Sequence, residues 1–310
     1  MSGRILVTPR SLTAAGLDAV PELAPLAEAG YELVPGPAGK LPSEEDLLAL
    51  VPDCAGWLAG VERITDRVLD AAPELKVISR NGAGTDGIDL DAATARGVRV
   101  ERAVGANAQG VAELAIVLAM SALRHVPWSA ASVHEGGWNR YQGRELADVT
   151  VGVFGLGEIG RRVAGAFRAL GADVVAHDPF SSFEGAEQVE PAELVRRSDV
   201  ITLHCPPPPD GKPLITADLL ARAPRGAVLI NTARSALVDD AAVLAALDDG
   251  GLTAYAVDAF DTEPPELTPL LRHERVIATP HVGGYTGASV RRATAGAVAN
   301  LLSVLKGGAA

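Results

Sequence analysis

Short apolar segments rich in Val, Ile and Leu alternate with segments of helical spacing over the first hundred residues. The expected strands are 4–7, 31–34, 56–58, 75–79 and 98–101. The expected helices are 12–29, 43–50, 65–72 and 91–96. Ser43, Thr65 and Asp89 or Asp91 are candidate N-caps, because their side-chain oxygens can accept the free amides of a first helical turn. Alternation of this kind predicts a mostly parallel sheet covered by helices.

A second alternating series begins at residue 150. Between the two series, 107–125 is expected to form an apolar helix, and 127–146, rich in Trp, Gly and charge, is typical of an extended arm. The strands expected in the second series are 150–154, 173–177, 200–204, 227–231, 253–257 and 275–278. Six strands suit a doubly wound nucleotide-binding fold. A last helix, 288–305, would return to pack on the first series and make that domain discontinuous.

The composition narrows the class of protein. A chain of 310 residues, 48% hydrophobic, suits two domains, although one large α/β domain would also fit the length. The formal net charge of −12 argues against a nucleic-acid partner, because phosphate-backbone binding needs clustered Lys and Arg. Cys54 and Cys205 stand far apart and outside any C-x-x-C pair, so we expect no disulfide framework and no metal site. This cysteine usage fits a reducing compartment such as the cytoplasm.

Neither export nor a membrane is indicated. The first residues run into a strand without the pattern of a secretory signal. The most apolar segment, 111–123, carries Glu113 and is shorter than the roughly 20 residues of a membrane-spanning helix, so we expect a buried helix.

A glycine-rich turn follows the first strand of the second series and opens a helix. Its motif positions are Gly155, Gly157, Glu158, Ile159 and Gly160. In a G-x-G-x-x-G turn the first glycine allows the tight turn, the second lets the backbone approach a pyrophosphate, and the third lets helix and strand pack closely. The free amides of the helix N-terminus then face the phosphates. The motif in this context predicts a dinucleotide site, with an ordinary strand-to-helix turn or a methyltransferase of similar fold as the alternatives.

Asp178 follows the next strand, where an acidic residue can accept hydrogen bonds from the ribose hydroxyls of an adenine nucleotide. A carboxylate at this place repels a 2′-phosphate, and residues 179–183 contain no Arg or Lys to receive one. The pattern therefore favours NAD over NADP, although Arg161 and Arg162 lie nearby in the sequence.

Residues of candidate chemistry follow the later strands of the second series, at the edge where open α/β sheets bind their ligands. They are Cys205, Thr232, Ala233, Arg234, Asp258, Glu263 and His281. An imidazole titrates near neutral pH, a neighbouring carboxylate can hold its tautomer, and a guanidinium offers a planar fork of donors for a substrate carboxylate. Each residue alone could cap a strand or fix a turn. Their order beyond successive strands favours a catalytic site.

Several stretches of the chain resemble the signatures of the D-isomer-specific 2-hydroxyacid dehydrogenases. They are Asn-Thr-Ala-Arg at 231–234, Val-Asp-Ala-Phe-Asp-Thr-Glu-Pro-Pro at 257–265 and Thr-Pro-His-Val-Gly-Gly at 279–284. Upstream, 80–89 resembles the family's substrate loop and 107–113 the start of its inter-domain helix. The likeness covers nearly the whole chain, in the family's order. Within the family, the chain resembles phosphoglycerate dehydrogenase-like members, and we expect a short form without a regulatory domain.

The resemblance implies an α/β protein of two doubly wound parallel-sheet domains with the active site in the cleft. A flavodoxin-like substrate-binding domain would comprise 1–101 and 286–310. A Rossmann NAD-binding domain would comprise 102–285 and carry a dimerisation arm at about 127–146.

Roles for the chemical residues follow from the same resemblance. His281 would exchange a proton with the substrate oxygen while NADH delivers hydride to the carbon, and Glu263 would hold His281. Arg234 would bind the substrate carboxylate and the developing charge on oxygen. Along the cofactor, Asp258 would lie near the nicotinamide carboxamide. The further cofactor contacts would be Cys205, Thr232, Ala233, His281 and Gly283.

The identity of the substrate stays open at this point. Backbone amides at Gly82 and Ala83 would complete the carboxylate site. Arg80 matches a position that helps to hold the phosphate in phosphoglycerate dehydrogenases, whereas Ala59 stands where a second such Arg is expected. Ser235 stands where many relatives carry Gly. 3-Phosphoglycerate, glyoxylate, hydroxypyruvate and bulkier 2-oxo acids all remain candidates.

We therefore expect a cytoplasmic, homodimeric NAD-dependent oxidoreductase that acts on a small anionic 2-hydroxy or 2-oxo acid. The rival from another class is an NAD-sensing binding protein, because some transcriptional co-repressors resemble the same dehydrogenases. The intact set of Arg234, Glu263 and His281 weighs against it.

Overall fold

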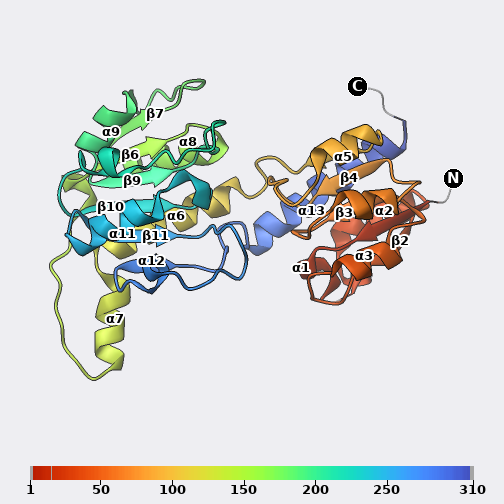
Figure 1. Ribbon diagram of the computed structural model, residues 1–310, viewed down its shortest axis with the longest axis horizontal. Coiled ribbons are helices and arrows are strands. Elements are labelled where there is room, and N and C mark those ends of the chain that lie inside the picture. The colour runs from red at the N-terminus through yellow and green to blue at the C-terminus, as the bar shows by residue number, and fades with distance from the viewer. Residues whose placement is uncertain (1–2, 15, 308–310) are drawn as a thin grey trace. The chain divides into compact units, whose positions relative to one another are not determined.

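The computed structural model describes residues 3–14 and 16–307, and the chain divides into two compact units (Figure 1). Unit 1 comprises Met1–Asn107 and Thr286–Ala310, and unit 2 comprises Ala108–Tyr285. The chain thus leaves unit 1 at Asn107 rather than at the expected residue 101, because the turn after the last strand of unit 1 stays with that strand.

The sheet of unit 1 is parallel, with the strand order β2-β1-β3-β4-β5. Its strands are β1 (Arg4–Val7), β2 (Glu32–Pro35), β3 (Cys54–Ala59), β4 (Val77–Arg80) and β5 (Arg99–Arg102). Successive side chains point to opposite faces of a strand, so Leu6 and Ile5 enter two different cores. The order is that of a flavodoxin-like doubly wound sheet, as the sequence analysis predicts.

The expected helix 12–29 is wrong as one continuous element. The structure breaks it into α1 (Arg10–Thr13), two 3₁₀ turns at Leu17–Ala19 and Pro21–Leu23, and α2 (Ala24–Glu28), while residue 15 lies outside the described residues. Gly16 at a φ of 86° and Pro21 at the start of a turn account for the breaks, since neither residue continues a helix.

The other helices of unit 1 begin where their caps predict. They are α3 (Glu44–Leu50), α4 (Asp66–Asp70) and α5 (Leu90–Ala95). Ser43, Thr65 and Asp89 each accept the amide of the residue three positions later, and Ser43 forms a full capping box with Asp46. Asp91 lies inside the first turn of its helix and is not the cap.

The last helix, α13 (Gly287–Leu305), completes the core of unit 1. Its Ala297, Val298 and Leu301 are buried against Ile5 and Val77. Figure 1 shows it in blue beside β3 and β4. One face of the first sheet is therefore covered by residues from the far end of the chain.

The sheet of unit 2 is also parallel, with the order β12-β11-β10-β9-β6-β7-β8. Its strands are β6 (Thr150–Phe154), β7 (Asp173–His177), β8 (Glu187–Gln188), β9 (Val200–Leu203), β10 (Ala227–Asn231), β11 (Leu252–Val257) and β12 (Val276–Ala278). The chain runs outward from β6 in both directions, which is the doubly wound arrangement of a Rossmann fold. The two-residue β8 was not predicted, since two exposed residues carry no periodic signal.

The helices of unit 2 cover both faces of that sheet. They are α6 (Ala108–Leu123), α8 (Glu158–Ala169), α9 (Pro191–Arg197), α10 (Ala217–Leu220), α11 (Asp240–Asp248) and α12 (Pro269–Arg272), with 3₁₀ turns at Leu146–Asp148 and Ser235–Leu237. The predicted burial of the apolar helix is confirmed, because Ala115, Leu118 and Ala119 of α6 lie in the core with β6.

The segment expected to be an extended arm is helical in its first half. α7 (Val126–His134) has Pro127 in its first turn, where a missing amide costs nothing. Among the described residues, no single helix is long and apolar enough to cross a membrane, whereas α6 and α7, bent by 63° at their break, pass that test of length and composition only as a pair. Figure 1 shows α7 extending away from the sheet of unit 2.

Candidate active site

The glycine turn between β6 and α8 has the shape that its sequence predicts. Gly155 has a φ of 89°, and a Cβ there would lie 2.6 Å from the carbonyl oxygen of His204. A Cβ on Gly160 would lie 1.9 Å from the carbonyl oxygen of Gly155, so helix and turn pack too closely for any side chain. A Cβ on Gly157 would meet nothing within 4 Å. The second glycine therefore borders open space, next to the free amides of Glu158 and Ile159 at the start of α8.

Asp178, which follows β7, holds this turn in place. Its Oδ2 accepts the Leu156 amide at 2.6 Å, and its Oδ1 accepts the amides of Phe180 and Ser181 at 2.8 and 3.0 Å. Burial by itself would raise the pKa of Asp178, but these three amides outweigh it and lower that pKa below its ordinary 3.8. The carboxylate is therefore ionised at neutral pH and adds negative charge beside the turn.

Both arginines that left the choice of cofactor open have partners in their own segment. Nε of Arg161 donates to the carbonyl oxygen of Leu156 at 2.7 Å. Nη1 of Arg162 donates to Oε2 of Glu158 at 2.8 Å, one helical turn away. The Arg161 guanidinium thus bonds to the glycine turn, and the Arg162 guanidinium bonds to the first turn of α8.

Two further predicted cofactor residues lie at the carboxyl ends of β9 and β10. Burial raises the pKa of the Cys205 thiol to about 11, so the thiol is neutral. The hydroxyl oxygen of Thr232 is buried and has no hydrogen-bond partner among the described residues. An unpartnered buried hydroxyl is costly, which makes Thr232 a natural contact for a polar ligand group.

The loop after β10 is shaped by Asn231, a residue that the sequence analysis did not single out. Its buried amide accepts the Ala233 backbone N–H at 3.1 Å and donates to the carbonyl oxygen of Arg234 at 2.8 Å. Arg234 in turn donates from Nη1 to the Ala233 carbonyl at 2.8 Å. The sequence did contain a signal for this role. Asn at the end of a buried strand often bonds to the backbone of the turn that follows.

Asp258, at the end of β11, is 2% exposed and is engaged by the loop that follows β12. Its Oδ1 accepts the Val282 amide at 2.8 Å and the Thr279 hydroxyl at 2.5 Å, and its Oδ2 accepts the Gly283 amide at 2.8 Å. Asp258 therefore anchors the loop that carries His281. Its predicted contact with a nicotinamide carboxamide stays a prediction.

His281 and Glu263 form the closest polar pair of the predicted set. Nδ1 of His281 lies 2.5 Å from Oε1 of Glu263, and since a carboxylate only accepts, the imidazole is the donor. Both side chains are partly exposed, at 50% and 39%. His281 has a φ of 51°, a left-handed conformation that is uncommon outside glycine. The bonds of Asp258 to the next two residues hold the backbone in this conformation.

The predicted substrate residues Arg80, Gly82 and Ala83 belong to unit 1, at the carboxyl end of β4. The carbonyl oxygens of Arg80 and Gly82 both accept the Ala103 amide, at 3.3 and 3.0 Å. A Cβ on Gly82 would lie 3.5 Å from Nη1 of Arg80, so the guanidinium lies against the loop. The structure thus brings these three residues together, and it separately brings together Asp258, Glu263 and His281 in unit 2.

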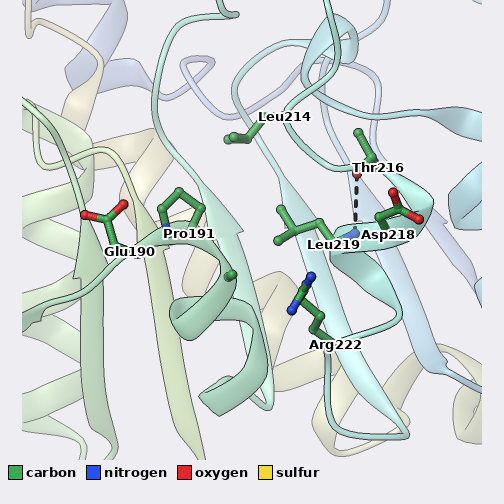
Figure 2. A pocket seen from close by; sticks show the side chains of 8 residues that line it. Glu190, Pro191, Leu214, Thr216, Asp218, Leu219 and Arg222 are labelled. Atoms are coloured by element: carbon green, nitrogen blue, oxygen red, sulfur yellow. Dashed lines mark hydrogen bonds between the residues drawn. The ribbon is translucent and has the colours of Figure 1, made fainter.

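A hollow of about 430 Å³ lies elsewhere in unit 2, near the starts of α9 and α10 (Figure 2). Pro191, Leu214 and Arg222 are among its lining residues. Thr216 at its rim caps α10 by accepting the Leu219 amide at 3.4 Å. None of the predicted site residues lines this hollow, and we assign it no part in the chemistry.

Comparison with known proteins agrees with this geometry. Residues 116–283 match the family described as "D-isomer specific 2-hydroxyacid dehydrogenase, NAD binding domain". The chain belongs to the D-isomer specific 2-hydroxyacid dehydrogenases. It is 40% identical over 260 residues to the D-3-phosphoglycerate dehydrogenase of Mycobacterium bovis, a match that covers 81% of this chain and 49% of that protein. The chain therefore spans about half the length of this curated relative.

Solved structures of relatives align along almost the whole of this chain. The TT0316 protein from Thermus thermophilus matches with a TM-score of 0.87 at 35% identity, covering 98% of this chain and 97% of that one. The NAD⁺-bound 3-phosphoglycerate dehydrogenase of Entamoeba histolytica matches with a TM-score of 0.85 at 28% identity, covering 100% and 97%.

The residues of this chain fit NAD, the cofactor of the domain family that residues 116–283 match. The open side of Gly157 leaves room for a pyrophosphate, and the ionised Asp178 suits a free ribose hydroxyl and repels a 2′-phosphate. The unpartnered hydroxyl of Thr232 offers a further polar contact.

Proposed function

We propose that the protein is an NAD-dependent dehydrogenase that reduces a small 2-oxo acid or oxidises the corresponding D-2-hydroxy acid. The observation that carries the proposal is the 2.5 Å pair of His281 and Glu263. The two residues lie on loops that follow β12 and β11, in the same parallel sheet whose β6 leads into the glycine turn. The relatives that are named D-3-phosphoglycerate dehydrogenases support the class of reaction.

His281 is the proposed acid and base. Because its Nδ1 is engaged by Glu263, its Nε2 is left for the substrate. In reduction, Nε2 gives a proton to the carbonyl oxygen, and in oxidation it takes the proton back from the hydroxyl. Glu263 fixes the orientation of the ring through its hydrogen bond to Nδ1. NADH, when bound, supplies the hydride for the substrate carbon.

Arg234 is the proposed partner of the substrate carboxylate, since its guanidinium can bind both carboxylate oxygens at once. Arg80 and the amides of Gly82 and Ala83 in unit 1 are proposed as further substrate contacts. Ala59, at the end of β3, offers no charge, so an acid without a phosphate, such as glyoxylate or hydroxypyruvate, is favoured over 3-phosphoglycerate.

The test is an NADH-oxidation screen across a panel of 2-oxo acids, with the His281→Ala variant beside the wild type. The variant should bind NADH within about threefold of the wild type and lose about 10²- to 10⁴-fold in turnover, the usual contribution of a general acid. His273→Ala, which removes a histidine of unit 2 outside both the predicted site and the segment 126–146, is the matched control and should leave turnover unchanged.

Near-normal turnover in His281→Ala would overturn the assignment of the acid. Tight NADH binding by the wild type with no turnover of any acid would instead favour an NAD-sensing binding protein.

We further propose that the protein is a cytoplasmic homodimer assembled through the segment 126–146. Exposed apolar side chains support this surface, since Val126, Val133 and Trp138 are 51%, 57% and 81% exposed. The free thiols of Cys54 and Cys205 support a reducing compartment.

A further inference from the structure

One side-chain bond in unit 2 joins the loop that carries Arg234 to the loop that carries Glu263. The hydroxyl of Ser235 donates to Oδ1 of Asp261. Ser235 directly follows Arg234, and Asp261 stands two residues before Glu263. The two loops leave β10 and β11, which are hydrogen-bonded neighbours in the sheet.

The loop of Glu263 lies at the surface. Residues 261–264 are all exposed, so burial contributes little to their position. Two side-chain hydrogen bonds join this segment to other parts of unit 2 in the described structure, one from Ser235 to Asp261 and one from His281 to Glu263. The first is therefore placed to limit how freely the second can move.

Asp261 also lies in acidic surroundings. Burial raises the pKa of Asp240, and the charges of Asp261 and Asp239 raise it further. The carboxyl groups of Asp240 and Asp261 therefore oppose each other's approach, and the Ser235 hydroxyl holds Asp261 with a hydrogen bond. The hydroxyl is therefore placed to fix the position of Asp261 and of the loop that carries it.

The backbone around Ser235 is held firmly, so that its hydroxyl can fix the position of Asp261. Asn231, which is fully buried, donates to the carbonyl oxygen of Arg234 at 2.8 Å, so the backbone just before Ser235 is tied to the end of β10. Leu237, two residues later, is buried in the core under β10. Ser235 is therefore held from both sides, whereas Asp261 is not.

We infer that Ser235 is a positioning residue of the proposed active site, which acts through Asp261 on Glu263 and so on the orientation of His281. The inference rests on the proposed function. It gives this chain a link between its carboxylate-binding Arg and its acid–base pair that a glycine at position 235 would not supply.

The test compares Ser235→Ala, Ser235→Thr and Asp261→Ala in the NADH-oxidation assay with the best substrate of the screen. Ser235→Ala should lower kcat about three- to tenfold with the KM for NADH unchanged, and Ser235→Thr, which keeps the hydroxyl, should stay within twofold of the wild type. The double variant with Asp261→Ala should lose no more than either single variant. In a Glu263→Gln background, Ser235→Ala should have no further effect.

A matched control is Ser43→Ala, which removes another Ser-to-Asp hydrogen bond, at 2.8 Å, in unit 1. It should leave kcat unchanged. A kcat for Ser235→Ala within 1.5-fold of the wild type, or an equal loss in the Glu263→Gln background, would overturn the inference.

Hydrogen–deuterium exchange of residues 259–268 separates this inference from the proposed function, because it needs no turnover. We expect at least threefold faster exchange in Ser235→Ala than in the wild type or Ser43→Ala. Unchanged exchange overturns the link between the loops, even if the wild type is active. Absence of turnover in the wild type, with faster exchange in the variant, supports the link and counts against the proposed function alone.

Discussion

The carboxylate of Asp258 and the backbone of Gly283 fit each other closely. Oδ2 of Asp258 accepts the Gly283 amide at 2.8 Å, and a Cβ at position 283 would lie 3.0 Å from the same oxygen. The residue between this contact and His281 is Val282, whose amide is held by the other oxygen. The position of the proposed acid is therefore set by a buried carboxylate on the neighbouring strand.

Replacing Asp258 by Asn should disturb this loop. The amide group of Asn would face one backbone N–H with a donor instead of an acceptor, which costs about 1–3 kcal/mol of folding free energy. We expect kcat to fall at least about tenfold, because a misplaced acid transfers its proton poorly. Urea unfolding and steady-state kinetics measure the two effects. Thr279→Val, which removes the hydroxyl and its bonds to Asp258 and to the Val257 carbonyl but leaves the Val282 and Gly283 amides on Asp258, should cost less. An Asn variant as active as the wild type would speak against the anchor.

Replacing Asp178 by Ala should weaken NADH binding and relax the preference for NADH over NADPH. The change removes the acceptor of the Leu156 amide and the negative charge beside the turn. A hydrogen bond to a charged group contributes about 1.5–3 kcal/mol, so we expect the Kd for NADH to rise about ten- to a hundredfold. Fluorescence titration with both cofactors measures this. Asp173→Ala, at the exposed opposite end of β7, is the control, and equal losses in both variants would contradict the role of Asp178.

The imidazole of His204, whose Nδ1 is buried without a partner among the described residues, should make stability depend on pH. Burial lowers the pKa of His204 from its ordinary 6.5 to about 3. The unfolded chain then binds a proton below pH 6.5 that the folded chain does not, so the contribution is complete above pH 6.5 and is lost as the pH falls toward 3. Between pH 7.5 and 5 the loss from this group is about 2 kcal/mol.

Since other groups titrate in the same range, the measurement is a comparison with His204→Asn. Urea unfolding at both pH values should show a drop in stability that is smaller in the variant by about that amount. Equal drops in the two proteins would show that His204 is not the source.

The stability of unit 1 should depend on the hydroxyl of Thr8, which follows β1 and bonds to the buried side chains of Glu62 and Trp57. Thr8 donates to Glu62 and accepts from Nε1 of Trp57 at 2.9 Å, and Thr8 and Glu62 are 1% and 2% exposed. Thr8→Ala leaves Nε1 of Trp57 buried without its acceptor and removes one of the two donors to Glu62, so we expect the free energy of unfolding to fall by about 1–3 kcal/mol. Thr8→Ser keeps the hydroxyl and should recover most of it. Chemical unfolding followed by Trp fluorescence decides the matter, and equal stability of the Ala and Ser variants would contradict the prediction.

The proposed dimer can be tested on α7. Val133→Glu places a charge on an exposed apolar position of the segment 126–146, and it should shift the protein from dimer to monomer in sedimentation velocity experiments. Leu170→Glu, at an apolar position of unit 2 that is 50% exposed outside this segment, is the control and should stay dimeric. A monomeric wild type, or a dimeric Val133→Glu protein, would overturn the proposed surface.

Elements with a strong local signal were predictable from the sequence. β6, β7 and β10 begin and end where their apolar runs do, and the caps Ser43 and Thr65 mark the starts of their helices. The glycine turn was predictable for the same reason, since backbone conformation and close packing demand glycine at Gly155 and Gly160.

Features that depend on contacts between residues far apart in the sequence were not predictable. The sequence placed Asp258 correctly at the carboxyl end of a strand. Its partners Val282 and Gly283 follow another strand, however, and no local pattern indicates which amides its oxygens accept. The link from Ser235 to Asp261 is of the same kind, because it needs the register of β10 against β11. The helix expected at 12–29 was wrong for the opposite reason. The local signals of Gly16 and Pro21, which interrupt helices, were present in the sequence but were given less weight than the apolar periodicity.

The position of α13 has a consequence for the order in which the protein matures. Ile5 and Val77 are synthesised before all of unit 2, but their core includes Ala297 and Leu301, which are synthesised after it. During synthesis from the N-terminus, unit 2 can therefore close its core while unit 1 still exposes one face of its sheet. The unit that begins first is completed last, and until α13 emerges its uncovered face is a surface that chaperones can bind and at which aggregation can start.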